Sequence, residues 1–333
     1  MFILFISSKT KIVALVLLLV IGSVLFFKDT AVMYFKGVKP GVTFLEHNVG
    51  GYSRDEVTEL IAAKYGEWVI SPVDAVYDEQ YSSIIPELWG YEVNIPKTVD
   101  KIMQALPDEA VYPVLETRLP DISIKDYPWA YIQQGNPLKK EVSFMINVAW
   151  GTEFIGPMLN ILADEDVSTS FFVVGSWAEN NIDLLKQIAE GGHTVENHGH
   201  TDAEVYTDFS PEEIKSGLER VNSIVFAATG RRPMYYTPHK GEYNDLVLET
   251  VSRLNMRTVL WSLDTVDWME PGVEAMKSRV LDNIHGGAIV LMHPTDDTVV
   301  LLREIIPVIK DQGFQIVTME KLLDPDYDRI EIK

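Results

Sequence analysis

The feature that most constrains the fold is a regular alternation of apolar runs and helix-like segments over residues 141–325. Seven short runs have the apolar content of buried strands, from Val142–Asn147 at the start to Phe314–Thr318 at the end. The segments between them carry helix signals, such as a capping box of Ser210 and Glu213 before an apolar stripe. Strands that alternate with helices are typical of a parallel sheet covered by helices. The sequence therefore predicts an α/β domain, a distorted seven-stranded β/α barrel.

A small α+β domain is predicted to precede the barrel, over residues 38–119. Two amphipathic helices are expected there, one after Ser53 and one ending at Pro107, with short strand-like pieces between them. Residues 120–140 are rich in proline and are predicted to form a linker. A chain of 333 residues is long enough for two such domains.

The N-terminus predicts a membrane anchor over residues 1–28. An uncharged run from Ile12 to Phe27 is flanked by lysines and spans about 24 Å as a helix, so it reaches across a bilayer core of roughly 30 Å only if those lysines extend to the head groups. The small residues that signal peptidase needs are poorly represented at Ile21–Ser23. We therefore expect a single-pass protein of the cell membrane with its bulk extracytoplasmic; secretion after signal cleavage is the alternative.

Composition excludes several classes of function. The net charge of −21 disfavours a nucleic-acid partner, because the phosphates would be repelled. The chain has no cysteine, which excludes disulfides, thiolate metal sites and a lipid-modified cysteine.

Polar side chains follow several of the predicted strands at their carboxyl ends, where the working residues of β/α barrels lie. The stretch His193–Asp202, "HTVENHGHTD", is the densest, and it contains the imidazoles and carboxylates that bind zinc and its first-row neighbours. His239 and His293 follow later predicted strands. His193 and His285 lie elsewhere and are expected to be structural. The sequence therefore predicts one polar pocket with a candidate metal site.

The motifs in this order, "INVAWGTE", "GGHTVENHGHTDAE", "TPHKGEYND", "WSLDTVDW" and "IVLMHP", resemble those of the polysaccharide deacetylases, carbohydrate esterase family 4, over residues 141–323. The resemblance implies a divalent metal, usually zinc, held by one aspartate and two histidines. It also implies hydrolysis of an acetyl group by metal-bound water. An aspartate steadied by an arginine acts as base, and a histidine oriented by another aspartate protonates the leaving amine.

Four positions depart from the family pattern, and three of them lose the family's charged side chain. The base position is Asn147, and a neutral amide cannot take a proton from water. The metal aspartate position is Val148, which has no donor atom, and the arginine position is Thr237. Losing the base and the arginine together avoids an unpaired charge in the pocket, and it leaves Asn147 and Thr237 as a neutral pair that can form a hydrogen bond.

The remaining motif positions are kept in part. His198 matches the first histidine ligand, and Asp202 stands where the family has the second. His200 or His239 could supply a third ligand. The resemblance also makes His293 the acid and Asp264 the carboxylate that orients it. Zinc or another divalent metal is therefore expected to bind weakly or not at all.

Four aromatic residues near strand ends are predicted to stack against sugar rings, with core filling as the alternative: Trp150, Trp177, Tyr236 and Trp268. The segment 38–119 resembles the peptidoglycan-binding domain of VanW-like wall proteins, and a spacer is the alternative. The leading hypothesis is a membrane-anchored deacetylase-like protein, a pseudoenzyme, that binds cell-wall glycan. Two alternatives stay open. One is an active deacetylase with rebuilt ligands His198, Asp202 and His239, and the other is a scaffold for protein interactions.

Overall fold

The computed structural model describes residues 17, 20, 22–23, 37–203 and 205–327. Almost all of the predicted anchor at residues 1–28 lies outside these described residues. Within the described part of the chain, no helix is both long enough and apolar enough to cross a membrane. The chain folds into two compact units, the first including Gly90–Arg118 and the second including Pro72–Trp89 and Leu119–Asp328.

The first unit is a small α+β fold. Helix α2 begins after Ser53, whose side chain forms the expected capping box with Glu56. Helices and apolar strand residues enclose a separate core that contains Phe44, Ile61 and Ile102. Its elements are β1 (Thr43–Phe44), β2 (His47–Asn48), α2 (Arg54–Tyr65), β3 (Val69–Ile70), β6 (Gly90–Val93), α3 (Ile95–Gln104), β7 (Ala110–Val111) and β8 (Leu115–Arg118).

The second unit is built on a curled parallel sheet with the strand order β13-β12-β11-β10-β9-β15-β14, and β16 pairs with the start of β9. Its strands are β9 (Glu141–Val148), β10 (Ser170–Val173), β11 (Thr194–Asn197), β12 (Tyr235–Tyr236), β13 (Arg257–Thr258), β14 (Leu263–Asp264), β15 (Ile289–Met292) and β16 (Gln315–Ile316). The predicted strand run at residues 257–263 is therefore two strands, because the chain leaves the sheet at Val259 and re-enters it at Leu263.

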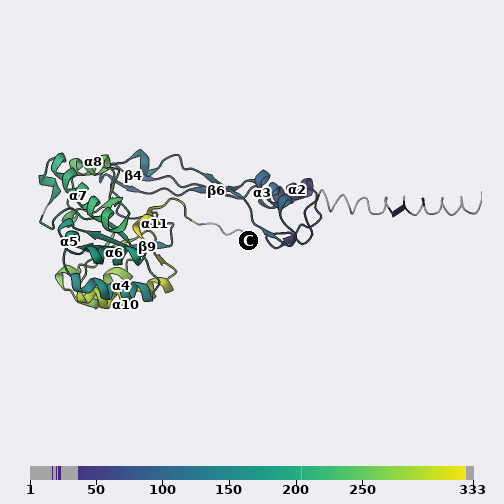
Figure 1. Cartoon of the computed structure of the whole chain (residues 1–333). Helices are drawn as coiled ribbons and strands as arrows, with labels where there is room; N and C mark the ends of the chain where they lie inside the picture. The colour runs from purple at the N-terminus through teal and green to yellow at the C-terminus, as the bar shows by residue number, and fades with distance from the viewer. Residues whose placement is uncertain (1–16, 18–19, 21, 24–36, 204, 328–333) are drawn as a thin grey trace, which may run out of the picture. The chain divides into compact units, whose positions relative to one another are not determined.

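Helices cover one face of this sheet. They are α4 (Thr152–Asp164), α5 (Gly175–Asn180), α6 (Ile182–Glu190), α7 (Pro211–Thr229), α8 (Asp245–Arg253), α9 (Val273–Leu281) and α10 (Asp296–Asp311), and Figure 1 shows α4 and α10 side by side. The short helix α11 (Met319–Leu323) packs on the other face. Side chains alternate along β9: Val142, Phe144, Ile146 and Val148 pack into the core beneath the helices, and Met145 belongs to a second core on the other face.

Residues 72–89 and 119–133 close the edge of the sheet beside β13. Ile132 forms a bridge with Val259, and Tyr131 forms one with Ser83 of strand β5 (Ser83–Ile85), which pairs with β4 (Val76–Asp78). Their apolar side chains join the same core as Met145. Residues 72–89 and the expected linker 120–140 therefore belong with the barrel, rather than with the expected domain 38–119, because these segments satisfy an otherwise open sheet edge.

Arg257 fastens this edge segment to the sheet. Its guanidinium donates hydrogen bonds to three backbone carbonyls, those of Ile124 at 2.7 Å, Tyr127 at 2.5 Å and Ala130 at 2.7 Å. Burial lowers the pKa of Arg257 to about 10, so the side chain stays charged at neutral pH. One cation therefore adds a charged donor to three carbonyls of residues 124–130 and holds this segment beside β13.

We expect Arg257→Met to lower the free energy of unfolding by about 2–3 kcal/mol, because three partly buried carbonyls lose a charged donor. The matched control is Arg253→Met, which removes only an exposed ion pair with Glu249 and should change stability by no more than about 0.5 kcal/mol. Denaturant melts of the three proteins measure both values, and equal effects of the two substitutions would contradict the role of Arg257.

Candidate active site

The carboxyl ends of β9, β11, β12, β14 and β15 surround one cavity of about 520 Å³. Parallel strands present these ends at the same edge of the sheet, which brings side chains from distant parts of the sequence together. Gly151, at φ 71°, allows the turn after β9 to approach the carbonyl of Pro294 more closely than a Cβ atom would permit. The cavity is lined by Asn147, Trp150, His198, Asp202, His239, Lys240, Trp261, Asp264, Trp268, Leu291 and His293.

His198 is held in the tautomer that suits a metal ligand. It follows β11, is buried, and its Nδ1 donates a hydrogen bond to the carbonyl of Thr237 at 2.8 Å. Because a carbonyl only accepts, the proton sits on Nδ1 and the Nε2 lone pair is free. Burial, reinforced by the neighbouring His239, lowers the pKa of His198 well below its usual value, so the ring is neutral.

His239 and Asp202 complete a group of three candidate ligands with His198. One ligand atom from each of the three lies within 4.8 Å of the others. The Nδ1 atom of His239 is 3.5 Å from Oδ1 of Asp202, and Nε2 of His239 is buried with no hydrogen-bond partner among the described residues. Burial also lowers the pKa of His239. Two neutral imidazoles and a carboxylate are a donor set that catalytic zinc uses, so these residues fit a divalent metal.

The other histidines do not join this group. His200 has a buried Nδ1 without a partner in the described structure, and it lies against Gly175. His193 accepts a hydrogen bond from the backbone N–H of Thr169 at 3.1 Å, and burial lowers its pKa to about 4. His285 bonds a nearby backbone carbonyl at 2.9 Å. His193 and His285 therefore occupy the structural positions that the sequence analysis expected.

The neutral pair of Asn147 and Thr237 does not form a hydrogen bond. Asn147 lines the cavity, and its Oδ1 is buried without a partner among the described residues. The hydroxyl of Thr237 instead contacts Sδ of Met145 at 3.7 Å, on the buried side of its strand. Val148 points the other way and lies in the apolar core under the helices, because neighbouring side chains on a strand alternate. The site therefore presents a neutral amide alone at the family's base position.

The carboxylate that orients His293 is Asp267, not Asp264, so the sequence prediction on this point is wrong. Oδ1 of Asp267 lies 2.7 Å from Nδ1 of His293, while Oδ2 accepts bonds from the backbone N–H of His293 and from the hydroxyl of Thr298. Asp264 instead accepts from the N–H of Val266 at 2.8 Å. The error arose because Asp264 ends β14 and Asp267 follows three residues later, and the turn between them decides which one reaches His293.

Asp264 faces the cavity from the same turn. Burial raises the pKa of its carboxyl group. The turn is strained, since Val266 has a φ of 57°, which a β-branched residue rarely adopts. Strain of this kind persists only where the surroundings impose it, here between two aspartates that both serve the site.

Comparisons with known proteins agree with this arrangement. A family model described as polysaccharide deacetylase matches residues 134–259. The uncharacterized protein YlxY of Bacillus subtilis is 34% identical over 82% of this chain and 85% of its own. The solved structure of a CE4 family pseudoenzyme from Bacillus anthracis is 31% identical, with a TM-score of 0.68 over 81% of this chain and 95% of that one. The chain belongs to the polysaccharide deacetylase family, carbohydrate esterase family 4.

Members of this family include both active and inactive proteins. A peptidoglycan-N-acetylglucosamine deacetylase of Bacillus cereus is 28% identical over 60% of this chain and 74% of its own. A mutant of the B. anthracis pseudoenzyme, 30% identical to this chain with a TM-score of 0.68, is described as having restored enzymatic activity. Family membership therefore establishes the fold and metal-dependent deacetylase ancestry, and the activity of this chain depends on its own residues.

Two of the four predicted stacking aromatics belong to the deacetylase cavity. Trp150 and Trp268 line it and are 42% and 58% exposed, and the Trp150 ring is parallel to that of His293 at 5.8 Å. The predicted stacking role does not apply to Trp177 and Tyr236, which are 6% and 1% exposed. Both fill the core, where Trp177 donates its indole N–H to a threonine hydroxyl.

The cavity also contains residues that the sequence analysis did not select. Trp261 and Leu291 supply apolar wall, and Lys240 supplies a cation on a turn where its φ is 56°. Asp267 lies in the motif "WSLDTVDW", and the spacing of that motif predicts no role for it. Trp261 lay inside a run predicted as one strand, and only the split of that run into β13 and β14 turns it toward the cavity.

We expect Asp267→Asn and His293→Ala each to destabilise the chain, Asp267→Asn by about 2–3 kcal/mol, because a fully buried carboxylate loses its charge-assisted bonds. The double substitution should cost less than the sum by about 1 kcal/mol or more, since the two residues share one interaction. Asp264→Asn is the matched control and should combine additively with His293→Ala. Denaturant melts of the single and double variants measure both coupling energies. A coupling energy between Asp264 and His293, with none between Asp267 and His293, would contradict the geometry.

Proposed function

We propose that this protein binds N-acetylated cell-wall glycan in the deacetylase cavity and is impaired as a deacetylase. The observation that carries the proposal is the amide of Asn147 at the base position, inside a cavity whose acid pair of Asp267 and His293 is intact. An amide has no basic lone pair at neutral pH, so it cannot take a proton from the attacking water. Replacement of the base by an amide affects proton transfer from the attacking water and does not change the shape of the cavity.

The glycan ligand is supported by the cavity wall and by the relatives. Trp150 and Trp268 are partly exposed indoles, of the kind that pack against the apolar face of a pyranose. The B. cereus relative is a deacetylase of peptidoglycan N-acetylglucosamine. We propose the same class of ligand here, in place of a protein-scaffold role. Binding of N-acetylglucosamine oligomers that is lost in Trp268→Ala would support the glycan ligand, and absence of such binding would favour the scaffold.

The proposal includes an extracytoplasmic location. The apolar run Ile12–Phe27 supports anchoring in the cell membrane, and the resemblance of residues 38–119 to a peptidoglycan-binding domain supports a position at the wall. Recovery of the chain in the soluble fraction of cells, instead of with membranes or medium, would contradict this part.

His198, Asp202 and His239 would hold the metal, which when bound activates water and polarises the acetyl carbonyl. The presence of these three groups in one place favours a second candidate function, an active deacetylase with rebuilt ligands. The two candidate functions predict different rates of acetate release but the same metal binding. Turnover and metal binding are therefore tested in separate experiments.

We expect acetate release from N-acetylglucosamine oligomers to be absent or barely detectable for the unaltered chain and to rise by about 10²–10⁴-fold in Asn147→Asp. Asn147→Ala is the control, since it changes the same side chain without supplying a base. Adding His198→Ala to Asn147→Asp should remove the gain. Robust zinc-dependent turnover by the unaltered chain would reject impairment and establish the second candidate.

We expect zinc to raise the free energy of unfolding by about 2.7 kcal/mol when its free concentration is a hundredfold above the dissociation constant. His239→Ala should weaken zinc binding strongly, because only two ligands then remain. His285→Ala, which changes a histidine outside the cluster, is the control. Equilibrium dialysis and thermal melts with and without chelator measure both effects, and equal zinc retention in His239→Ala would contradict this ligand set.

A further inference from the structure

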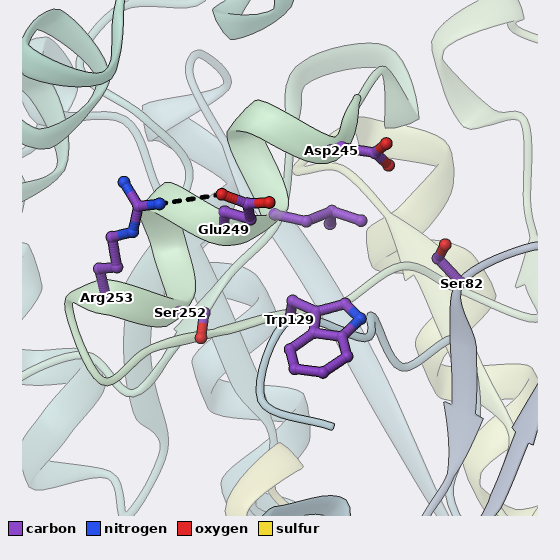
Figure 2. A pocket seen from close by; sticks show the side chains of 7 residues that line it. Ser82, Trp129, Asp245, Glu249, Ser252 and Arg253 are labelled. Carbon is purple, nitrogen blue, oxygen red and sulfur yellow. Dashed lines mark hydrogen bonds and ion pairs between the residues drawn. The ribbon is translucent and has the colours of Figure 1, made fainter. Parts of the chain in front are cut away.

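The barrel unit has a second cavity, of about 490 Å³, that shares no lining residue with the deacetylase cavity. We refer to it as the Trp129 groove. Figure 2 shows Trp129 beside helix α8, with Ser82 and Asp245 toward one end of the groove and Ser252 and Arg253 toward the other. Nothing in the deacetylase chemistry described above uses these residues.

The groove is built partly from residues that precede the part of the chain matched by the deacetylase family model. Ser82 and Trp129 lie before the matched residues 134–259, in the two segments that close the sheet edge beside β13. The ring of Trp129 is 42% exposed, and Tyr127 packs against it edge-on at 6.1 Å. Tyr127 is in turn stacked on Tyr77 at 4.3 Å. The exposed ring is therefore held in place by an aromatic cluster, and its exposed surface is available to a ligand.

The charges around the ring favour a cation. Glu249 is paired with Arg253 at 2.9 Å across one turn of α8, so these two charges cancel. Asp245 has no partner among the residues that the structure describes, which leaves one unpaired carboxylate on the groove wall. The chain as a whole carries a net charge of −21, so the field around the groove also attracts cations.

We propose that the Trp129 groove binds an amino sugar whose amine is free, with the pyranose ring against Trp129 and the ammonium group facing Asp245. The apolar face of a pyranose packs on an exposed tryptophan ring, and the carboxylate of Asp245 on the groove wall accepts a charge-assisted hydrogen bond from the ammonium group. The hydroxyls of Ser82 and Ser252 supply neutral hydrogen-bonding groups for sugar hydroxyls. An N-acetylated sugar has no positive charge and loses the ionic part of this recognition.

The lining residues of the groove and of the deacetylase cavity come close together along the chain. Lys240 lines the cavity and Asp245 lines the groove, and five residues of chain span at most about 18 Å. An acetylated unit can then occupy the cavity while a deacetylated unit of the same strand occupies the groove. The choice of a glycan as the ligand rests on the proposed function; the preference for a free amine rests on the groove.

Calorimetric titration of the full chain with glucosamine oligomers and with N-acetylglucosamine oligomers, in mildly acidic low-salt buffer, tests this inference. We expect Trp129→Ala to weaken binding of the glucosamine oligomer at least about fivefold, and Trp129→Phe to retain most of it. Asp245→Asn should weaken the same ligand and should remove most of its salt dependence. Asp311→Asn, which removes an exposed carboxylate at the end of α10, is the matched charge control.

Two results would overturn the inference. One is the absence of glucosamine binding by the unaltered chain, and the other is binding that responds to Trp268→Ala but not to Trp129→Ala or Asp245→Asn. Neither result affects the proposed function, which depends on binding of the N-acetylated oligomer in the cavity that Trp268 lines. If the N-acetylated oligomer does not bind and the glucosamine oligomer does, the proposed function is rejected and the inference about the groove is retained.

Discussion

The buried carboxylate of Asp267 is the interaction on which the geometry of the site depends. It accepts three hydrogen bonds, two from His293 at the end of β15 and one from Thr298 in the first turn of α10. A carboxylate with no exposed side-chain surface is tolerated only when its oxygens are satisfied, so these partners must stay in place together. The strained turn at Val266 follows from this requirement, because the chain has to deliver Asp267 inward and leave Asp264 at the cavity.

Sequence patterns predicted the strands and most of the cavity, because burial and strand-to-helix alternation are local properties. They failed where two parts of the chain must meet. The run at residues 257–263 contains two strands because Ile132, far away in sequence, pairs with Val259. Whether Asp264 or Asp267 reaches His293 depends on the φ of Val266. Trp177 and Tyr236 are aromatic, like the residues that stack on sugars, but they lie in the core. Spacing along the chain does not contain this information.

The substitutions at the family's catalytic and metal-binding positions are physically consistent with one another. Val148 belongs to the apolar core under the helices, where a carboxylate would be costly. Asn147 and Thr237 are neutral, so no charge is left without the partner that the family supplies. His239 and Asp202 add ligand atoms beside His198, which preserves a donor set without the lost aspartate. Asn147 itself supplies no base, and the carboxylates that line the same cavity are those of Asp202 and Asp264.

Binding and turnover make different demands on such a cavity. Affinity for a sugar comes from ring faces, hydrogen bonds and any metal contact, none of which needs a base, whereas hydrolysis needs all of them and a base as well. A cavity that keeps the first set and loses the second holds an acetylated glycan without consuming it. If the Trp129 groove binds free amino sugars as proposed, the chain would recognise acetylated and free amino sugars at two sites, and its binding would depend on the pattern of deacetylation along a strand. In such a protein, hydrolysis in the cavity would remove the acetyl groups that are recognised, so loss of the base would preserve the recognised pattern.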